Sequence, residues 1–253
     1  MTLKSAAQYE IKGVPIAQLN NQPLKVRYNV FPPTRKDYLS LFANALQKGS
    51  PHYLAPGEMR HCLEVGTGTG VLSFILNAHG AKRVTGVDIN EDAVLNAQEN
   101  RALLGKNESE LAFVRADLFP AATDSDAKYD LLVCNPPWLP MPVETAEACP
   151  HNPGTDGLMG GVLDRRGDLL PALFRGLTDR LSSRGRLWLI YSDLSIKLGL
   201  QDESWLKHLC EANGLLVRAQ TSMPARVRLH PQDPFYQLKK GEVLTLYEIV
   251  PKH

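Results

Sequence analysis

The sequence predicts an α/β fold: a doubly wound, seven-stranded, mostly parallel sheet with a C-terminal antiparallel hairpin and a short N-terminal extension. Apolar strand-like runs alternate with helical segments from residue 60 onwards. The first run ends in an acidic residue and three alternating glycines, 64–70, and a later one ends in Asn-Pro-Pro-Trp, 135–138. In such folds, turns at the carboxyl edge of the sheet bind ligands.

Size and composition limit the class of protein. A chain of 253 residues with a net charge of +1 fits one large domain without an overall field for nucleic acid. The four cysteines form no Cys-x-x-Cys pair and no zinc-like cluster with histidine, which argues against disulfides and metal. No signal pattern or bilayer-length apolar run is present. We therefore predict a cytoplasmic protein without a membrane partner, and its oligomeric state stays open.

The chain divides into an N-terminal extension with a cap helix, 1–50, and a main domain, 51–253. Alternating apolar residues in the extension predict a strand over 24–30. Pro33 and Thr34 open a helix that ends before Gly49. From the residues alone this is an ordinary Pro-initiated helix with Asp37 in its first turn.

The glycine turn connects a strand over 62–65 to a helix over 69–79. Glycine allows the backbone to turn sharply and lets a ligand approach it closely. A dinucleotide-binding turn has the spacing Gly-x-Gly-x-x-Gly, and here valine occupies its third glycine position, 71. An NAD site is therefore the weaker interpretation. The residues of this turn are Glu64, Gly66, Thr67, Gly68 and Gly70.

The second predicted strand, 83–87, ends in Asp88, about twenty residues beyond the glycines. An acidic residue at that distance typically binds the hydroxyls of a ribose. The alternative is that Asp88 caps the helix over 91–104, a role for which Asn90 competes. Ile89, the next residue, is expected to contact the same ligand.

Two further strands, 111–115 and 129–134, complete the first part of the sheet. The former leads into Asp117 and Leu118, where an aspartate is also common in an ordinary turn. The latter ends at the motif 135–138, because consecutive prolines lack the N–H groups that a central strand needs. The motif is thus presented at the carboxyl edge of the sheet.

The glycine turn resembles motif I of the class I S-adenosylmethionine (SAM) methyltransferases, which have a Rossmann-like fold. Asn-Pro-Pro-Trp resembles their amino-methylating signature. The stretches 154–158 and 165–166 resemble the HemK/PrmC family of release-factor glutamine methyltransferases, and so does the helix opened by Pro33 and Thr34, which by this resemblance lines the SAM pocket. The resemblance covers roughly residues 28–192. The resemblance implies SAM as cofactor and an adenine contact for Asp117 and Leu118. The cofactor-binding residues it implies are Glu64, Gly66, Thr67, Gly68, Gly70, Asp88, Ile89, Asp117, Leu118 and Asn135.

The expected catalytic residues are Asn135, Pro136 and Trp138. An amide or aromatic amine is a poor nucleophile because its lone pair is delocalised, so the site has to bind its N–H groups. The side-chain oxygen of Asn135 and the backbone carbonyl of Pro136 are the expected acceptors. Trp138 is expected to stack on the flat acceptor group. If instead Asn-Pro-Pro only ends the strand, Trp138 is a core residue.

The C-terminal half is less regular. Residues 121–128 and 139–164 are expected to be loops. They are followed by a helix from 164 or 165 to 181, a strand over 186–191 and a helix over 202–212. An antiparallel pair of strands, 214–220 and 243–250, is expected to close the sheet. The densest basic segment contains Arg226, Arg228, His230, Lys239 and Lys240, interrupted by Phe235 and Tyr236. This segment is interpreted either as a solvated hairpin connection or as a grip on a phosphate backbone.

The leading hypothesis is a SAM-dependent N-methyltransferase acting on a protein glutamine. Trp138 replaces the tyrosine usual in the family, and the chain before Phe31 is shorter than the helical N-terminal domain of the bacterial enzymes. Residues 1–30, 139–164 and 226–240 are therefore expected to dock the substrate. The alternatives are transfer to an exocyclic amine of RNA or DNA, transfer to a small-molecule amine, a non-catalytic SAM-binding partner, and an NAD oxidoreductase.

Overall fold

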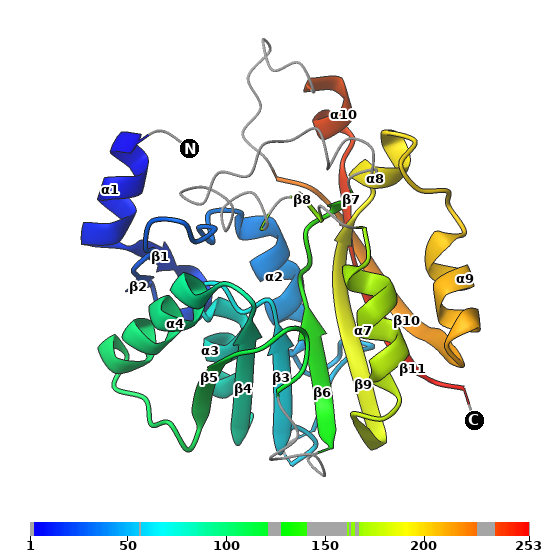
Figure 1. Cartoon of the computed structure of the whole chain (residues 1–253), viewed down its shortest axis with the longest axis horizontal. Helices are drawn as coiled ribbons and strands as arrows, with labels where there is room; N and C mark the ends of the chain where they lie inside the picture. Colours follow the sequence, from blue (N-terminus) through cyan, green and yellow to red (C-terminus); the bar gives the residue numbers. More distant parts are fainter. Residues whose placement is uncertain are drawn as a thin grey trace.

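A computed structural model describes residues 3–55, 57–120, 128–140, 161, 163–164, 167–226 and 236–252. Within these ranges, seven strands form one sheet in the order β10-β11-β9-β6-β3-β4-β5 (Figure 1). Their bounds are β3 His61–Val65, β4 Arg83–Asp88, β5 Leu111–Arg115, β6 Tyr129–Cys134, β9 Leu181–Ser192, β10 Leu215–Pro224 and β11 Val243–Pro251. The predicted seven-stranded sheet is confirmed.

The order of the strands determines where a ligand can bind. β3 pairs in parallel with both β4 and β6, and further parallel pairs extend the sheet to β5 on one side and to β9 on the other. β11 is antiparallel to β9, and β10 is antiparallel to β11, which confirms the predicted C-terminal pair. The chain runs outward from β3 to β5 and then restarts at β6. The loops after β3 and β6 therefore diverge, and they open a crevice at the carboxyl edge.

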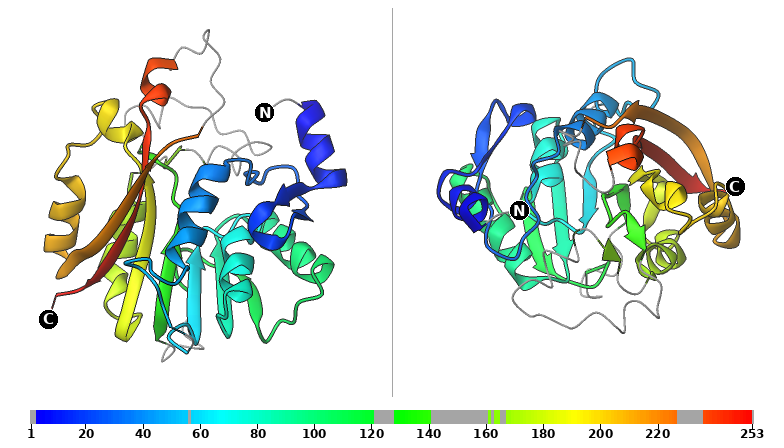
Figure 2. Two further views of the ribbon diagram at one scale, coloured as in Figure 1. Left: turned by 180° about the vertical axis from the view of Figure 1, so that it is seen from behind. Right: turned by 90° about the horizontal axis from the view of Figure 1, so that it is seen from above.

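Helices cover both faces of the sheet (Figure 2). One hydrophobic cluster joins α2 (Lys36–Ala45), α3 (Val71–Ala78) and α4 (Glu91–Leu103) to one face. A second cluster joins α7 (Leu169–Leu177) and α9 (Trp205–Ala212) to the other. Neighbouring strand residues alternate between the two clusters, as Leu131 and Leu132 do in β6. Because both faces are buried, the central strands read as continuous apolar runs.

The N-terminal extension packs on the first of these clusters. It contains α1 (Leu3–Lys12), η1 (Ala17–Leu19) and a two-stranded sheet of β1 (Val14–Ile16) and β2 (Gln22–Leu24). The predicted strand over 24–30 is wrong, since strand structure ends at Leu24. The backbone N–H groups of Lys25 and Arg27 donate instead to the side-chain oxygens of Asn100 (2.9 Å) and Asn96 (3.0 Å) of α4.

Several predicted helices differ in their bounds, and α3 and α9 are shorter than the predicted ranges 69–79 and 202–212. α2 begins at Lys36, after an extended Arg35 at its N-cap, and so two residues beyond the predicted start at Thr34. α7 spans Leu169–Leu177 instead of 164 or 165 to 181, and it ends early because the chain needs the following residues to enter β9. There Arg180 accepts a backbone hydrogen bond from Tyr129 (2.8 Å), and Leu181 pairs with the same tyrosine.

Short elements surround the crevice. They are β7 (Leu139–Pro140), which pairs with β8 (Leu163–Asp164), and the helices α8 (Leu194–Lys197) and α10 (Tyr236–Lys240). Most of the predicted loops 121–128 and 139–164, the stretches 154–158 and 165–166, and Arg228 and His230 lie outside the described residues. Among the helices that are described, none has the length and apolar character needed to cross a membrane.

Candidate active site

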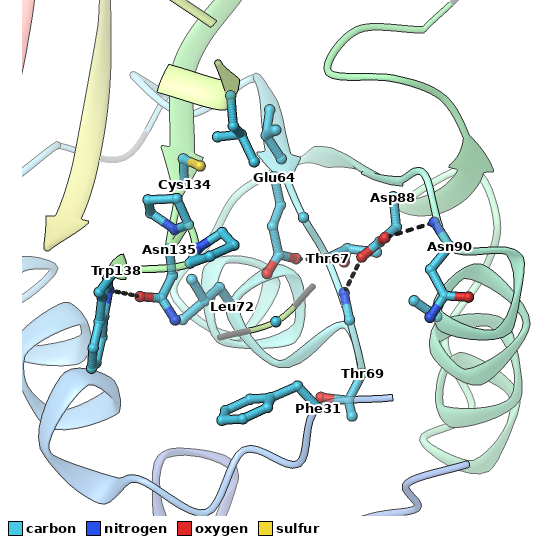
Figure 3. A pocket seen from close by; sticks show the side chains of 18 of the residues that line it. Phe31, Glu64, Thr67, Thr69, Leu72, Asp88, Asn90, Cys134, Asn135 and Trp138 are labelled. Carbon is cyan, nitrogen blue, oxygen red and sulfur yellow. Dashed lines mark hydrogen bonds between the residues drawn. The ribbon is translucent and has the colours of Figure 1, made fainter. Parts of the chain in front are cut away.

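A cavity of about 570 Å³ opens where the loops after β3 and β6 diverge (Figure 3). It lies at the position that the strand order predicts for a ligand. Gly70 is the one predicted site residue that does not line it. There φ is +84°, and a Cβ would come within 2.7 Å of the Phe74 ring, so Gly70 serves the turn and its packing. The predicted residues that do line the cavity are Glu64, Gly66, Thr67, Gly68, Asp88, Ile89, Asp117, Leu118, Asn135, Pro136 and Trp138.

The glycine turn is anchored to the end of β4. The N–H groups of Gly66 and Thr67 both donate to the carbonyl of Val87 at 2.9 Å, and the N–H of Gly68 donates to Asp88 Oδ2 at 3.0 Å. Gly66 and Gly68 have φ of +73° and +52°, which favours glycine, and a Cβ on either would meet nothing within 4 Å. The turn therefore leaves open space above its backbone, as a bound ligand requires.

Glu64 is buried at the end of β3, with 2% of its surface exposed. Its Oε2 accepts hydrogen bonds from the Thr67 hydroxyl (2.8 Å), the Ser73 N–H (3.0 Å) and the Ser73 hydroxyl. Burial raises the pKa of Glu64 to about 7, against the effect of these bonds and with a smaller contribution from the Asp88 charge. Gly86 makes room for the arrangement, because a Cβ there would lie 2.6 Å from Thr67 Oγ1. Glu64 thus titrates near neutral pH inside the cavity.

Asp88 is oriented by two backbone groups. Besides the Gly68 bond, Asp88 Oδ1 accepts from the N–H of Asn90 at 2.9 Å. Burial raises the pKa of Asp88, although these hydrogen bonds oppose the shift. Asn90, whose side chain accepts from the N–H of Asp92 at 3.1 Å, occupies the N-cap of α4. Asp88 is therefore free of that alternative role, and its carboxylate retains acceptor capacity for a ligand.

Residues that follow β5 form one wall of the cavity. Leu118 has φ of +66°, an uncommon conformation for leucine, and the N–H of Phe119 donates to the Asp117 carbonyl at 2.8 Å. Backbone strain of this kind is often stored at ligand sites. Asp117 is exposed and Ile89 is 60% exposed, and both line the cavity, so polar and apolar contacts are available there together.

Asn135 and Trp138 contact each other directly at the end of β6. The indole N–H of Trp138 donates to Asn135 Oδ1 at 3.1 Å and to the carbonyl of Ile190 at 3.3 Å (Figure 3). An indole N–H needs an acceptor, so this bond fixes which end of the Asn135 amide is the oxygen. The guanidinium carbon of Arg35 lies 4.6 Å from the centre of the Trp138 ring. One face of the indole is therefore covered by a cation.

Several lining residues were not among the predicted site residues. Phe31, Arg35 and Tyr38 line the cavity, which supports the interpretation that the first turn of α2 borders the pocket. Asp37 resembles an ordinary first-turn acid in the sequence, yet it is 1% exposed and binds Arg35. Because Arg35 and Asp37 are only two residues apart, an ion pair between them could have been suggested from the sequence. Nothing in the sequence points to Glu242, the second partner of Arg35.

The fold, the glycine turn and the carboxylates at the strand ends define a class I methyltransferase domain. A family model described as "Methyltransferase domain" matches residues 58–246, and the chain belongs to this family. The cofactor is S-adenosylmethionine, which the cavity fits through its open glycine turn and its carboxylates. NAD, the alternative cofactor, is not favoured.

Relatives of the chain are methyltransferases. One, from Methanocaldococcus jannaschii, is named "Putative protein N5-glutamine methyltransferase" and is 33% identical over 152 residues, 59% of this chain and 69% of the relative. The release factor glutamine methyltransferase of Fusobacterium nucleatum is 41% identical over 83 residues, 32% of this chain and 23% of its own. The tRNA1(Val) (adenine(37)-N6)-methyltransferase of Proteus mirabilis is 35% identical over 89 residues, 34% and 33% of the two chains. The chain thus spans only a quarter to a third of these last two proteins.

Solved structures share the fold at low sequence identity. The ribosomal protein L11 methylase of Lactobacillus delbrueckii subsp. bulgaricus has a TM-score of 0.54 at 18% identity, covering 92% of this chain and 87% of its own. A geranyl diphosphate methyltransferase in complex with SAM has a TM-score of 0.57 at 9% identity, covering 85% and 84%. These likenesses confirm the architecture.

The Asp88 carboxylate provides a direct test of the cofactor side of the cavity. We expect Asp88→Ala to weaken SAM binding at least about tenfold, because it removes the charged acceptor predicted for the ribose hydroxyls. Isothermal titration calorimetry measures the change. Glu108→Ala is the matched control, since its side chain is 76% exposed and does not line the cavity. Unchanged affinity in Asp88→Ala contradicts the ribose assignment.

Proposed function

We propose that this SAM-dependent methyltransferase transfers the methyl group to a planar nitrogen, and that its acceptor is the side-chain amide of a protein glutamine. The observation that carries the proposal is the fixed Asn135 oxygen at the cavity wall, 3.1 Å from the Trp138 indole nitrogen. Support for a glutamine comes from the relative named as a protein N5-glutamine methyltransferase, 69% of which aligns with this chain.

Each end of the cavity has a role in this proposal. Asp88 binds the ribose, Asp117 and Leu118 bind the adenine, and Ile89 packs beside it. Glu64 faces the amino-acid part of the cofactor. Its three hydrogen bonds all fall on Oε2, so Oε1 remains available to the cofactor's ammonium group. The glycine turn forms the floor between these groups.

The chain's own contribution to transfer is to bind and orient the acceptor. SAM supplies an electrophilic methyl group on a sulfonium. The Asn135 side-chain oxygen and the Pro136 carbonyl accept the two N–H groups of the amide, which concentrates electron density on its nitrogen and directs its lone pair. A carbonyl oxygen has two lone pairs, so Asn135 Oδ1 accepts from Trp138 and from the substrate together. The proton released by the nitrogen passes to water.

A nucleobase amine is the second candidate acceptor. The similarity to a tRNA adenine-N6 methyltransferase over 89 residues favours it, because an adenine amine presents the same two N–H groups. The near-neutral net charge of +1 provides no overall attraction for RNA. A small-molecule amine remains the third candidate.

Methyl labelling of a cell extract distinguishes these acceptors. The extract is incubated with the protein and tritiated SAM and then separated into protein, nucleic-acid and small-molecule fractions. We expect the label in protein, at a glutamine that mass spectrometry locates. Label confined to the nucleic-acid fraction supports the second candidate instead. A control without added protein measures the labelling by enzymes already in the extract, and equal labelling with and without the protein indicates a non-catalytic SAM-binding protein.

Trp138 is expected to affect transfer more than cofactor binding. Trp138→Phe keeps a ring but removes the N–H that orients Asn135, so we expect kcat to fall about tenfold, the value of one lost hydrogen bond. Trp138→Ala also removes the ring and is expected to lower kcat further. SAM affinity, measured by calorimetry, changes less than kcat in both variants. The reverse order of effects places Trp138 on the cofactor side.

A further inference from the structure

Trp138 is held on both its edge and its face. Its N–H donates to Asn135 Oδ1 and to the Ile190 carbonyl, which fixes the edge of the ring. The guanidinium of Arg35, 4.6 Å from the ring centre, covers one face. A cation in this position is attracted to the electron-rich face of the indole. The contact restrains the ring whose N–H orients Asn135.

Arg35 is itself fixed by two buried carboxylates. Its Nε and Nη2 donate to Asp37 at 3.1 and 2.6 Å, and its Nη1 donates to Glu242 Oε1 at 2.9 Å. Asp37 and Glu242 are 1% and 2% exposed. Burial by itself raises the pKa of Asp37, but the hydrogen bonds and charge of Arg35 outweigh it and lower that pKa. The plane of the guanidinium is therefore determined by three bonds before it meets Trp138.

The two carboxylates are anchored in turn. Glu242 Oε1 also accepts from the Ser192 hydroxyl at 2.7 Å, and Asp37 Oδ2 accepts from the backbone N–H of Arg226 at 3.0 Å. Because two acids face one guanidinium, Arg35 offers no net positive charge to an anionic substrate. The face of its guanidinium instead contacts the Trp138 ring.

We propose that Arg35 is a positioning residue for methyl transfer: it holds Trp138, and the Trp138 N–H in turn keeps Asn135 Oδ1 directed at the acceptor nitrogen. The inference rests on the proposed function in one respect, which is that Asn135 binds the nitrogen of the methyl acceptor. Arg35 acts through the indole and does not bind that nitrogen.

The first test follows the Trp138 indole N–H by ¹H–¹⁵N NMR and needs no substrate. The chain has three tryptophans, and the signal of Trp138 is identified by its loss in Trp138→Phe. We expect Arg35→Ala to move this signal upfield and to speed its exchange with water, as a weakened hydrogen bond does. The control is Arg27→Ala, an arginine of the same N-terminal segment that pairs with half-exposed Glu99.

Arg35→Lys keeps a positive charge between the carboxylates but lacks the planar fork, and it serves if Arg35→Ala does not fold. We expect its Trp138 signal to move in the same direction by a smaller amount. An unmoved signal in a folded Arg35 variant overturns the inference.

The second test is a double-mutant cycle on turnover. Arg35→Ala is expected to lower kcat about tenfold with SAM affinity unchanged, and to have no further effect in the Trp138→Phe background. Arg35→Lys restores part of the activity. Multiplicative losses in the double variant, or equal effects on kcat and SAM affinity, overturn the inference. If the wild-type protein does not methylate glutamine, the proposed function fails, whereas the NMR result still decides the role of Arg35.

Discussion

Asn135→Ala is expected to reduce methyl transfer by on the order of 10²–10³-fold, the usual cost of losing one preorganised group that stabilises charge in a transition state. The wild-type side chain is held by the indole N–H of Trp138, so its oxygen needs no reorganisation when the acceptor binds. Alanine removes one of the two groups proposed to bind the acceptor's N–H groups. Single-turnover kinetics with tritiated SAM and a glutamine peptide measure the loss.

SAM binding separates this effect from general damage to the protein. We expect the affinity of Asn135→Ala for SAM to change far less than the transfer rate, because the other wall residues stay in place. Asn107→Ala is the matched control, since Asn107 is exposed and lies away from the cavity. Transfer at the wild-type rate in Asn135→Ala removes the basis of the proposed function.

SAM affinity is expected to fall about tenfold for each pH unit below 7. Burial raises the pKa of Glu64 to about 7, with the Asp88 charge adding to the shift, so the empty site holds a neutral carboxyl in more acidic solution. In the proposed site the ammonium group of the cofactor lies beside Glu64 and favours its carboxylate form, so binding then has to displace a proton. Calorimetry in buffers of different ionisation enthalpy measures both the affinity and the released proton.

Glu64→Gln is the control for this pH dependence. The amide cannot release a proton, so we expect weaker binding at pH 8 and a flat profile below 7.

Glu64 also links pH to stability. Its pKa of about 7 in the folded protein lies above the ordinary 4.5, so its contribution is fully present below about pH 4.5 and is lost as pH rises to about 7. The free energy of unfolding falls by roughly 3 kcal/mol over that interval, and a pH-independent difference between wild type and Glu64→Gln contradicts this assignment.

The cofactor half of the site could be predicted because its signals are local. β5 and β6 have the predicted bounds, and the glycine turn and Asp88 lie where their spacing placed them. The strand predicted over 24–30 failed for a physical reason. Leu24, Val26 and Val30 are buried, so the apolar alternation is real, but side chains of α4 satisfy the backbone where a strand would need a partner.

The acceptor half could be predicted only in part. Asn135 and Trp138 stand out in the sequence, but the hydrogen bond between them depends on how the chain turns after two prolines. The contact between Arg35 and Glu242 joins positions that are 207 residues apart, and no periodicity or spacing encodes it. Long-range polar contacts of this kind arise from the packing of the whole domain.

The same contact has a consequence for biosynthesis. Glu242 immediately precedes the last strand of the sheet, whereas Arg35 precedes the first turn of α2. A nascent chain that has emerged from the ribosome only as far as β9 already carries the glycine turn, Asp88 and Asn135. It does not yet contain Glu242, the second acid that binds Arg35. The cofactor pocket is thus encoded before β9 has been made, whereas the role proposed for Arg35 in orienting the methyl acceptor also needs an acid that is encoded after β9.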